Sequence, residues 1–280
     1  MTIDHLPDEA ITHAGKFHAD DVFSAALLRL LRPGIRIRRV LRIPDGYSGL
    51  AFDIGWGPFD HHQKGAPVRD NGTPYAAFGL LWRALGASLL GEDGARRFDE
   101  RFVQPLDLDD NTGCGNLLAD AIGAFNPAWD SLEDPDACFE EAVSAAGLLL
   151  RKRIEAMRAA QRGFALVREA LAAARDGIVH LERFAPWKPV LVPSDAEFLI
   201  YPSQRGGFNA QVVPIDEEGG PAKCPFPASW AGKEAGELQR LSGIGTLSFC
   251  HNGRFLIAAG TREDAERACR AARGEAAREK

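Results

Sequence analysis

The chain has 280 residues, of which 45% are hydrophobic, and a formal net charge of −6 at pH 7. Such a composition is typical of a globular protein with one large or two modest domains, and it disfavours a protein that coats long nucleic-acid duplexes through a general basic surface. The sequence has no apolar run of about 18 residues, and its acidic N-terminus does not have the basic and apolar regions of a signal peptide. We therefore expect a cytoplasmic protein with no membrane partner. The five cysteines are scattered and form no C-x-x-C pair, which argues against a disulfide framework or a cysteine zinc site.

Strands and helices are expected to alternate through the first part of the chain. Strand character is strongest at 10–12, 36–43 and 49–55. Apolar residues recur at helical spacing at 20–31, 74–90, 94–108 and 136–175. Asp20 or Asp21 suits the N-terminal cap of the first helix, and the last helix contains Gly147 and Gly163 as points where it can bend. This order predicts an α/β domain with a parallel sheet over residues 1–175.

Beyond about residue 177 the sequence becomes β-rich. Short strands separated by Pro, Gly and Asn turns are expected at 178–183, 188–194, 198–203, 208–214, 246–250 and 254–260. Turns are expected at 204–208 and at the Asn-Gly pair 252–253. A final helix is expected to begin after Thr261, which is a favourable N-terminal cap. We expect a smaller β-rich α+β domain over residues 176–280.

Histidines and aspartates gather where the strands of the first domain end. They form four motifs in chain order: H-x4-H-x-D, a strand-end aspartate, the triplet DHH and D-x-x-D. The residues are His13, His18 and Asp20; Asp53; Asp60, His61 and His62; and Asp107 and Asp110. In an open α/β sheet, ligands bind beyond the carboxyl ends of the strands, so these side chains can converge despite their distance in sequence. The pattern indicates one polar site built from several loops.

Metal binding is the chemistry that this set favours. Nitrogen and oxygen donors without thiolate suit Mn²⁺ or Mg²⁺, with Zn²⁺ or Co²⁺ as alternatives, and the excess of carboxylates suggests two ions that share a bridging aspartate. Asp53 interrupts an apolar strand, where an unpaired carboxylate would be costly. Each residue alone has a simpler explanation, Asp20 as a helix cap and His13 and His18 as polar loop residues, but the ordered set is more specific than its members.

Several stretches of the chain are similar to a known family. These stretches are THAGKFHADDVFSAALLRLL, DIG, FDHHQ and LDDN, followed by NPAW, QVVP and HNGRF. Through them the chain resembles the melanocyte-proliferating-gene family, a branch of the DHH phosphoesterases whose eukaryotic members are described as 3′–5′ RNA exonucleases. The similarity runs in order through nearly the whole chain. It implies a DHH-type parallel-sheet catalytic domain, with a smaller C-terminal domain that closes over two divalent ions, most often manganese.

The resemblance also implies roles for individual residues. His13 and His18 with Asp53 would hold one ion, and the other would be held by Asp20, Asp53, His61 and Asp110, so that Asp53 is the bridge. In this sequence 254–260 stands where a more glycine-rich segment is expected, which leaves the substrate contacts of the second domain less defined. Arg205 and His251 are its candidates for phosphate contact, although each is equally well explained as an ordinary hairpin residue.

Chain geometry separates the two adjacent histidines. Successive side chains of an extended backbone point to opposite sides, so His61 and His62 do not easily face the same ion. With His61 as the ligand, His62 is left to contact the phosphate or protonate the leaving oxygen, and Asp60 to orient a neighbouring group. We therefore expect His62 and Asp60 to be the catalytic residues.

The function expected from these residues is metal-dependent hydrolysis of a phosphoester. The preferred substrate is single-stranded RNA or a short oligonucleotide, degraded from the 3′ end. A small pyrophosphate or dinucleotide is the alternative substrate, favoured by the negative net charge, and a metal-binding regulator without turnover is the alternative of a different class. Basic stretches at 29–42 and 151–162 either line an anionic-substrate cleft or are solvated faces. The sequence leaves the oligomeric state, monomer or homo-oligomer, open.

Overall fold

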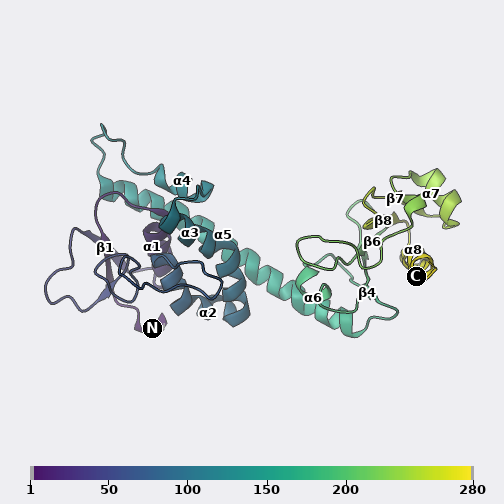
Figure 1. Ribbon diagram of the computed structural model, residues 1–280, viewed down its shortest axis with the longest axis horizontal. Coiled ribbons are helices and arrows are strands. Elements are labelled where there is room, and N and C mark those ends of the chain that lie inside the picture. The colour runs from purple at the N-terminus through teal and green to yellow at the C-terminus, as the bar shows by residue number, and fades with distance from the viewer. Residues whose placement is uncertain (1–2, 279–280) are drawn as a thin grey trace. The chain divides into compact units, whose positions relative to one another are not determined.

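A computed structural model describes residues 3–278 of the protein. The chain divides into two compact units, Met1–Arg158 and Ala159–Lys280. The division falls within the longest helix, α5 (Pro135–Ala172), which Figure 1 shows as one long element. The domain boundary expected at residue 175 lies just beyond the end of that helix. Among residues 3–278, no helix is both long enough and apolar enough to cross a membrane.

The N-terminal unit is built on a small parallel sheet. Its strands are β1 (Glu9–His13), β2 (Arg36–Val40) and β3 (Leu50–Ala51), in the order β2-β1-β3. The central strand β1 pairs in parallel with both neighbours, and its middle residues are fully buried. The predicted α/β class and the strand that ends at His13 are confirmed. β3 is shorter than the stretch 49–55, because the backbone leaves the extended region at Asp53, which has φ of 54°.

The N-terminal unit also contains several helical segments besides α5. They are α1 (Ala19–Leu31), α2 (Ala77–Phe98), the π-helical turn η2 (Asp99–Val103), α3 (Gln104–Thr112) and α4 (Leu117–Gly123), and a short 3-10 turn, η1 (Ile3–His5), precedes the sheet. α1 packs against α2, α3 and α4 (Figure 1). Phe23 of α1 stacks on Phe78 and meets Phe102 edge-on, at centroid distances of 5.4 Å in both cases. This aromatic cluster anchors the helix whose first turn enters the candidate site.

Two details of the helices differ from the sequence expectation. Gly91 has φ of 68° and interrupts α2, so the predicted helices at 74–90 and 94–108 are one run with a break at a residue that tolerates left-handed backbone. The assignment of Asp20 or Asp21 as the cap of α1 is wrong, because the helix begins at Ala19 and His18 occupies the cap position. Asp21 instead accepts a hydrogen bond of 2.9 Å from the backbone N–H of His18.

The C-terminal unit contains a mixed five-stranded sheet. Its strands are β4 (Ile178–His180), β5 (Phe198–Pro202), β6 (Phe208–Val212), β7 (Leu247–Cys250) and β8 (Leu256–Ala259), in the order β4-β5-β6-β8-β7. Only β4 and β5 pair in parallel. α8 (Arg262–Ala276) packs on β5, β6 and β8, while α7 (Ala235–Ser242) contacts β7 and the 3-10 turn η3 (Ala228–Trp230). Thr261 caps α8 as predicted, by accepting a hydrogen bond from the backbone N–H of Asp264.

One predicted strand in this unit is wrong. Residues 188–194 include a short helix, α6 (Lys188–Leu191), with Pro189 in its first turn, a position that suits proline. The ammonium group of Lys223, with three N–H donors, lies within hydrogen-bonding distance of four backbone carbonyls at and after the end of this helix, those of Leu191, Val192, Ser194 and Ala196. A lysine from a distant segment thus helps to satisfy carbonyl groups that the end of the helix leaves without an intrahelical partner.

Candidate metal centre

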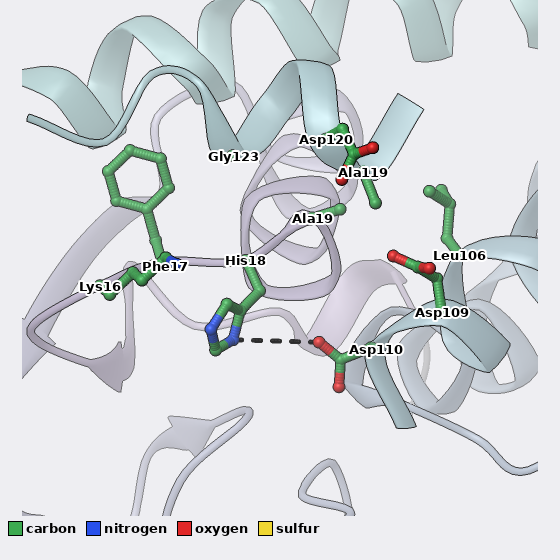
Figure 2. Close-up of a pocket in the computed structure, with 10 residues that line it drawn as sticks. All are labelled: Lys16, Phe17, His18, Ala19, Leu106, Asp109, Asp110, Ala119, Asp120 and Gly123. Atoms are coloured by element: carbon green, nitrogen blue, oxygen red, sulfur yellow. Dashed lines mark ion pairs between the residues drawn. The ribbon is translucent and has the colours of Figure 1, made fainter. Parts of the chain in front are cut away.

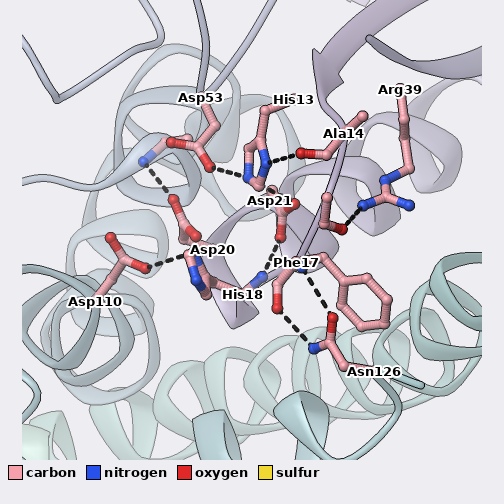
Figure 3. Close-up of polar contacts among 12 residues, drawn as sticks. His13, Ala14, Phe17, His18, Asp20, Asp21, Arg39, Asp53, Asp110 and Asn126 are labelled. Atoms are coloured by element: carbon pink, nitrogen blue, oxygen red, sulfur yellow. Dashed lines mark hydrogen bonds and ion pairs between the residues drawn. The ribbon is translucent and has the colours of Figure 1, made fainter. Parts of the chain in front are cut away.

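The candidate site of the N-terminal unit forms where the carboxyl ends of its parallel strands meet the first turn of α1. β1 supplies His13, α1 supplies Asp20 and Asp21, the segment after β3 supplies Asp53, and α3 supplies Asp110 (Figure 3). The segment 60–62 adds His61 and His62, which Figure 3 leaves out. Parallel strands bring their carboxyl ends to one edge, which explains why residues so far apart in sequence lie together.

Asp53 lies at the centre of this cluster. Its Oδ2 atom is 3.1 Å from Nε2 of His13, and its Oδ1 atom is 3.2 Å from Nε2 of His61. The residue is only 3% exposed, and its backbone N–H donates to the carbonyl of Phe59 at 2.9 Å. The left-handed backbone at this position, which Asp tolerates better than most residues, turns the two carboxylate oxygens toward two different groups of donors.

The first group of donors consists of His13, Asp21 and Asp53. Nε2 of His13 is 3.2 Å from Oδ2 of Asp21, and one donor atom from each of the three residues lies within 4.8 Å of the others. Asp21 is fully buried. The sequence reasoning gave this residue only a capping role, although the doubled aspartate at the start of α1 was the signal that could have revealed it.

The second group of donors surrounds His61. Nε2 of His61 is 3.2 Å from Oδ2 of Asp110, 3.2 Å from Oδ1 of Asp53 and 3.7 Å from Oδ2 of Asp20. His18 lies beside the same carboxylates, with Nδ1 3.9 Å from Oδ1 of Asp110, and its side chain is half-exposed. The ring of His18 is 5.9 Å from that of His13 between centroids, so this imidazole lies between the two groups.

The two adjacent histidines do not point to opposite sides as expected, since their rings lie 4.3 Å apart and Nδ1 of His62 is 3.6 Å from Oδ1 of Asp53. They differ instead in exposure and in hydrogen-bond partners. The side chain of His61 is 6% exposed, whereas that of His62 is 57% exposed. Nδ1 of His62 is 2.7 Å from Oδ1 of Asp60, and the other carboxylate oxygen of Asp60 accepts a hydrogen bond of 2.6 Å from the backbone N–H of Trp56. Asp60 is therefore fixed by the backbone and fixes one nitrogen of His62, which leaves Nε2 of that ring available.

The protonation equilibria reflect the crowding of charge in the site. Burial opposes protonation of His13, but Asp21 and Asp53 outweigh it and raise the pKa of His13 to about 10. Burial opposes ionisation of Asp53, but the neighbouring His13 and His61 lower the pKa of this carboxyl group to about 2. Burial and the negative charges of Asp53 and Asp110 raise the pKa of Asp20 well above its ordinary value. The cluster thus concentrates negative charge that positive groups must balance.

The donors fit divalent cations. Four buried side-chain atoms of the cluster make no hydrogen bond, namely Oδ1 of Asp20, Oδ2 of Asp21, Oδ1 of Asp53 and Nε2 of His61. Buried polar atoms without a partner are costly, and carboxylate and imidazole donors that converge in this way are typical ligands of Mn²⁺, Mg²⁺ and Zn²⁺. Three groups of such residues satisfy the spacing that one ion requires: His13, Asp21 and Asp53; His18, Asp20 and Asp110; and Asp53, His61 and His62.

Residues outside the cluster hold its loops in place. The side-chain amide of Asn126 brackets Phe17, accepting from its backbone N–H at 3.0 Å and donating to its carbonyl at 2.9 Å (Figure 3). Asp107, which the sequence grouped with the site, instead binds the guanidinium of Arg69 at 2.7 Å and the backbone N–H of Gly79 at 3.1 Å. Asp107 therefore anchors α3 and does not reach the donors.

A pocket of about 380 Å³ opens beside the second group of donors. Figure 2 shows the imidazole of His18 facing the carboxylate of Asp110 at one side of this pocket. The other lining residues are Lys16, Phe17, Ala19, Leu106, Asp109, Ala119, Asp120 and Gly123. Of the donors, His18 and Asp110 are thus accessible from this pocket.

The candidate phosphate contacts lie in turns of the C-terminal unit. Arg205 lies in the exposed turn between β5 and β6, where its backbone N–H donates to the hydroxyl of Ser203. His251 lies in the β7–β8 hairpin, where Nδ1 accepts a hydrogen bond of 2.9 Å from the N–H of Gly253 and the ring lies 4.2 Å from that of Phe255.

The first basic stretch is largely neutralised within the N-terminal unit. Its arginines form ion pairs with nearby carboxylates in five cases, Arg29 with Glu140, Arg32 with Asp8, Arg36 and Arg38 with Glu9, and Arg39 with Asp136. Paired guanidinium groups of this kind contribute little net positive field. The idea that 29–42 forms a basic wall for an anionic substrate is not supported.

Comparison with known proteins places this chain in a family. A family model named MYG1_exonuc, described as "Uncharacterised protein family (UPF0160)", matches residues 9–272. "MYG1 exonuclease" of Rattus norvegicus is 28% identical over 95% of this chain and 84% of its own length. The "MYG1 protein" of Dictyostelium discoideum is 26% identical, over 91% of this chain and 93% of its own, and that of Chlamydia pneumoniae is 27% identical, over 95% and 96%. No solved structure matches. Because the family model covers nearly the whole sequence, the chain belongs to the MYG1 exonuclease family.

Proposed function

We propose that this protein is a two-metal phosphodiesterase of the DHH type that removes nucleotides from the 3′ end of single-stranded RNA or short oligonucleotides. The name of the relatives, exonuclease, supports a nucleic-acid substrate, and the donor cluster supports a metal-dependent reaction. The observation that carries the proposal is the position of Asp53. One carboxylate oxygen faces His13 and the other faces His61, which is the arrangement that a bridging ligand needs.

The ligands follow from the two groups of donors. His13 and Asp53 bind the first ion. The third ligand is either Asp21, which lies beside His13, or His18, which the family resemblance assigns. The second ion takes Asp20, Asp53, His61 and Asp110. Because all these donors are oxygen or imidazole nitrogen, Mn²⁺ is the preferred ion and Mg²⁺ the next. When bound, such a pair supplies an activated water nucleophile and neutralises charge on the phosphoryl oxygens.

His62 is the proposed proton carrier. Asp60 holds Nδ1 of His62 at 2.7 Å, so the proton on that nitrogen stays in place and Nε2 exchanges protons with the substrate side. The ring is more than half exposed, as a group that meets an incoming substrate must be. We assign His62 to protonation of the leaving oxygen and Asp60 to the orientation of the imidazole.

A panel of labelled substrates tests this function. The metal-free protein should be inactive, and added Mn²⁺ should restore stepwise loss of single nucleotides from the 3′ end of a 5′-labelled RNA. The matched arms are DNA of the same sequence, RNA with a blocked 3′ end, a dinucleotide and inorganic pyrophosphate. Full activity without metal contradicts the metal centre, whereas preference for pyrophosphate or the dinucleotide establishes the small-substrate alternative. Mn²⁺ binding without any turnover supports the regulator.

A further inference from the structure

Asn111 of α3 connects the candidate metal centre to the backbone around it. Its Oδ1 atom is 3.3 Å from Nδ1 of His61, the ring nitrogen that points away from the carboxylates. The amide nitrogen of Asn111 donates to two carbonyl oxygens, that of Tyr75 at 3.2 Å and that of Asp107 at 2.8 Å. Every polar atom of this side chain therefore has a partner, and only one partner belongs to the metal centre.

These contacts fix the direction of the amide. Two carbonyl oxygens accept hydrogen bonds and cannot donate, so they require the NH₂ side of Asn111 to face them. Its oxygen then faces His61, and because that oxygen only accepts, Nδ1 of His61 must carry a proton. In the neutral imidazole the lone pair is consequently on Nε2, the atom that lies 3.2 Å from both Asp53 and Asp110.

The two carbonyls are themselves held firmly. Two guanidinium groups lie against the ring of Tyr75, with Arg69 at 3.8 Å and Arg83 at 4.7 Å from its centroid. Arg69 also binds the carboxylates of Asp99 and Asp107 at 2.7 Å each. The buried network around Arg69 thus sets the position of both acceptors, and through them the direction of the amide.

We propose that Asn111 is the positioning residue that sets the tautomer and ring orientation of His61 for metal binding. The inference rests on the proposed metal centre. Hydrogen bonds of this kind to the far nitrogen of a ligating histidine typically change metal affinity roughly 10–100-fold. Asn111 needs no contact with the ion, and the chain supplies an amide here instead of a carboxylate, which adds no negative charge to a crowded acidic site.

Mn²⁺ titration calorimetry on the full chain gives the first measurement. Asn111→Ala and Asn111→Leu should each weaken binding at the subsite of His61 by roughly 10–100-fold, while the other subsite keeps its affinity. Asn111→Leu preserves the bulk of the side chain and so guards against loss of packing. The control is Asn71→Ala, because Asn71 is exposed and bonds only Gln104 and the N–H of Thr73, away from the donors.

Nitrogen NMR of the wild-type protein gives a second measurement that does not depend on any variant folding. In the Zn²⁺-loaded protein, His61 should carry its proton on Nδ1, and the shift of that nitrogen should show the hydrogen bond to Asn111. Unchanged Mn²⁺ affinity in both variants, or an Nδ1 without a proton, overturns the role of Asn111 alone. Absence of Mn²⁺ binding by the wild type overturns the metal centre and the proposed function with it.

Discussion

In the N-terminal unit the buried interior contains charged groups, whereas in the C-terminal unit it is apolar. Among residues 3–278, the buried polar or charged side chains all fall between Thr12 and Asp107, and they include Asp20, Asp21 and Asp53. The buried cluster of the C-terminal unit under α8 consists of aliphatic, aromatic and cysteine side chains, such as Phe198 and Cys269.

This difference affects how each unit is stabilised. An apolar interior stabilises its unit through burial alone, at about 25 cal/mol per Å² of apolar surface. A buried carboxylate costs free energy unless it is paired, and the carboxylates near Asp53 exceed the positive groups that two histidines can supply. The N-terminal unit therefore has donor groups that could hold cations, whereas, among residues 3–278, the apolar cluster of the C-terminal unit offers no such group.

The largest effect is expected from removal of the shared carboxylate. Asp53→Ala should abolish hydrolysis and reduce bound Mn²⁺ from about two ions per chain to fewer than one, since both groups of donors lose a ligand. Asp110→Ala should chiefly weaken one ion. Metal analysis of the purified variants measures both, with Asp93→Asn, an exposed carboxylate of α2 away from the donors, as control. Equal loss of a single ion in the two variants would contradict a bridging role for Asp53.

The two adjacent histidines give the next largest effect. His62→Ala should keep both ions and lower kcat by roughly 10²–10⁴-fold, the usual range for loss of a general acid or base. His61→Ala should lower metal occupancy because its Nε2 atom faces the carboxylates. Single-turnover kinetics and metal analysis on the same samples distinguish the roles. If His62→Ala loses an ion and His61→Ala does not, the assignments are reversed.

A comparison of Asp21 and His18 would decide which of them completes the first group of donors. If the buried Asp21 is the ligand, Asp21→Asn should weaken Mn²⁺ binding there by more than His18→Ala, which removes a half-exposed imidazole. Titration calorimetry measures the affinities, and circular dichroism checks that Asp21→Asn keeps α1, since Asp21 also binds the N–H of His18. A larger loss in His18→Ala would favour the ligand set that the family resemblance implies.

The smallest effect is expected from the C-terminal unit. Arg205→Ala and His251→Ala should raise KM for an oligonucleotide several-fold, in the range of a lost exposed charge contact, while Mn²⁺ binding stays unchanged. Steady-state kinetics with RNA of different lengths measures this, and Arg240→Ala, on α7 of the same unit, is the control. Unchanged KM in both variants would show that these hairpin turns do not contact substrate, and would confine the chemistry and the recognition to the N-terminal unit.

The sequence by itself determined features that depend on local patterns. The strand that ends at His13, the hairpin turn at Asn252 and the Thr261 cap follow from apolar periodicity and from the backbone preferences of single residues. Most residues of the candidate centre could also be predicted, because histidines and aspartates at strand ends are few and ordered, but Asp21 was assigned only to a helix cap.

Only the tertiary structure decided which of these residues share a subsite. The two carboxylate oxygens of Asp53 face different donors because the backbone after β3 is left-handed. The contact between His61 and Asn111 joins residues 50 positions apart. Lys223, from a distant segment, contacts the carbonyls of Leu191, Val192 and Ser194 where the predicted strand is replaced by the end of α6. Local propensity cannot encode such contacts, because the free energy of a buried polar group depends on partners that only the folded chain brings within hydrogen-bonding distance.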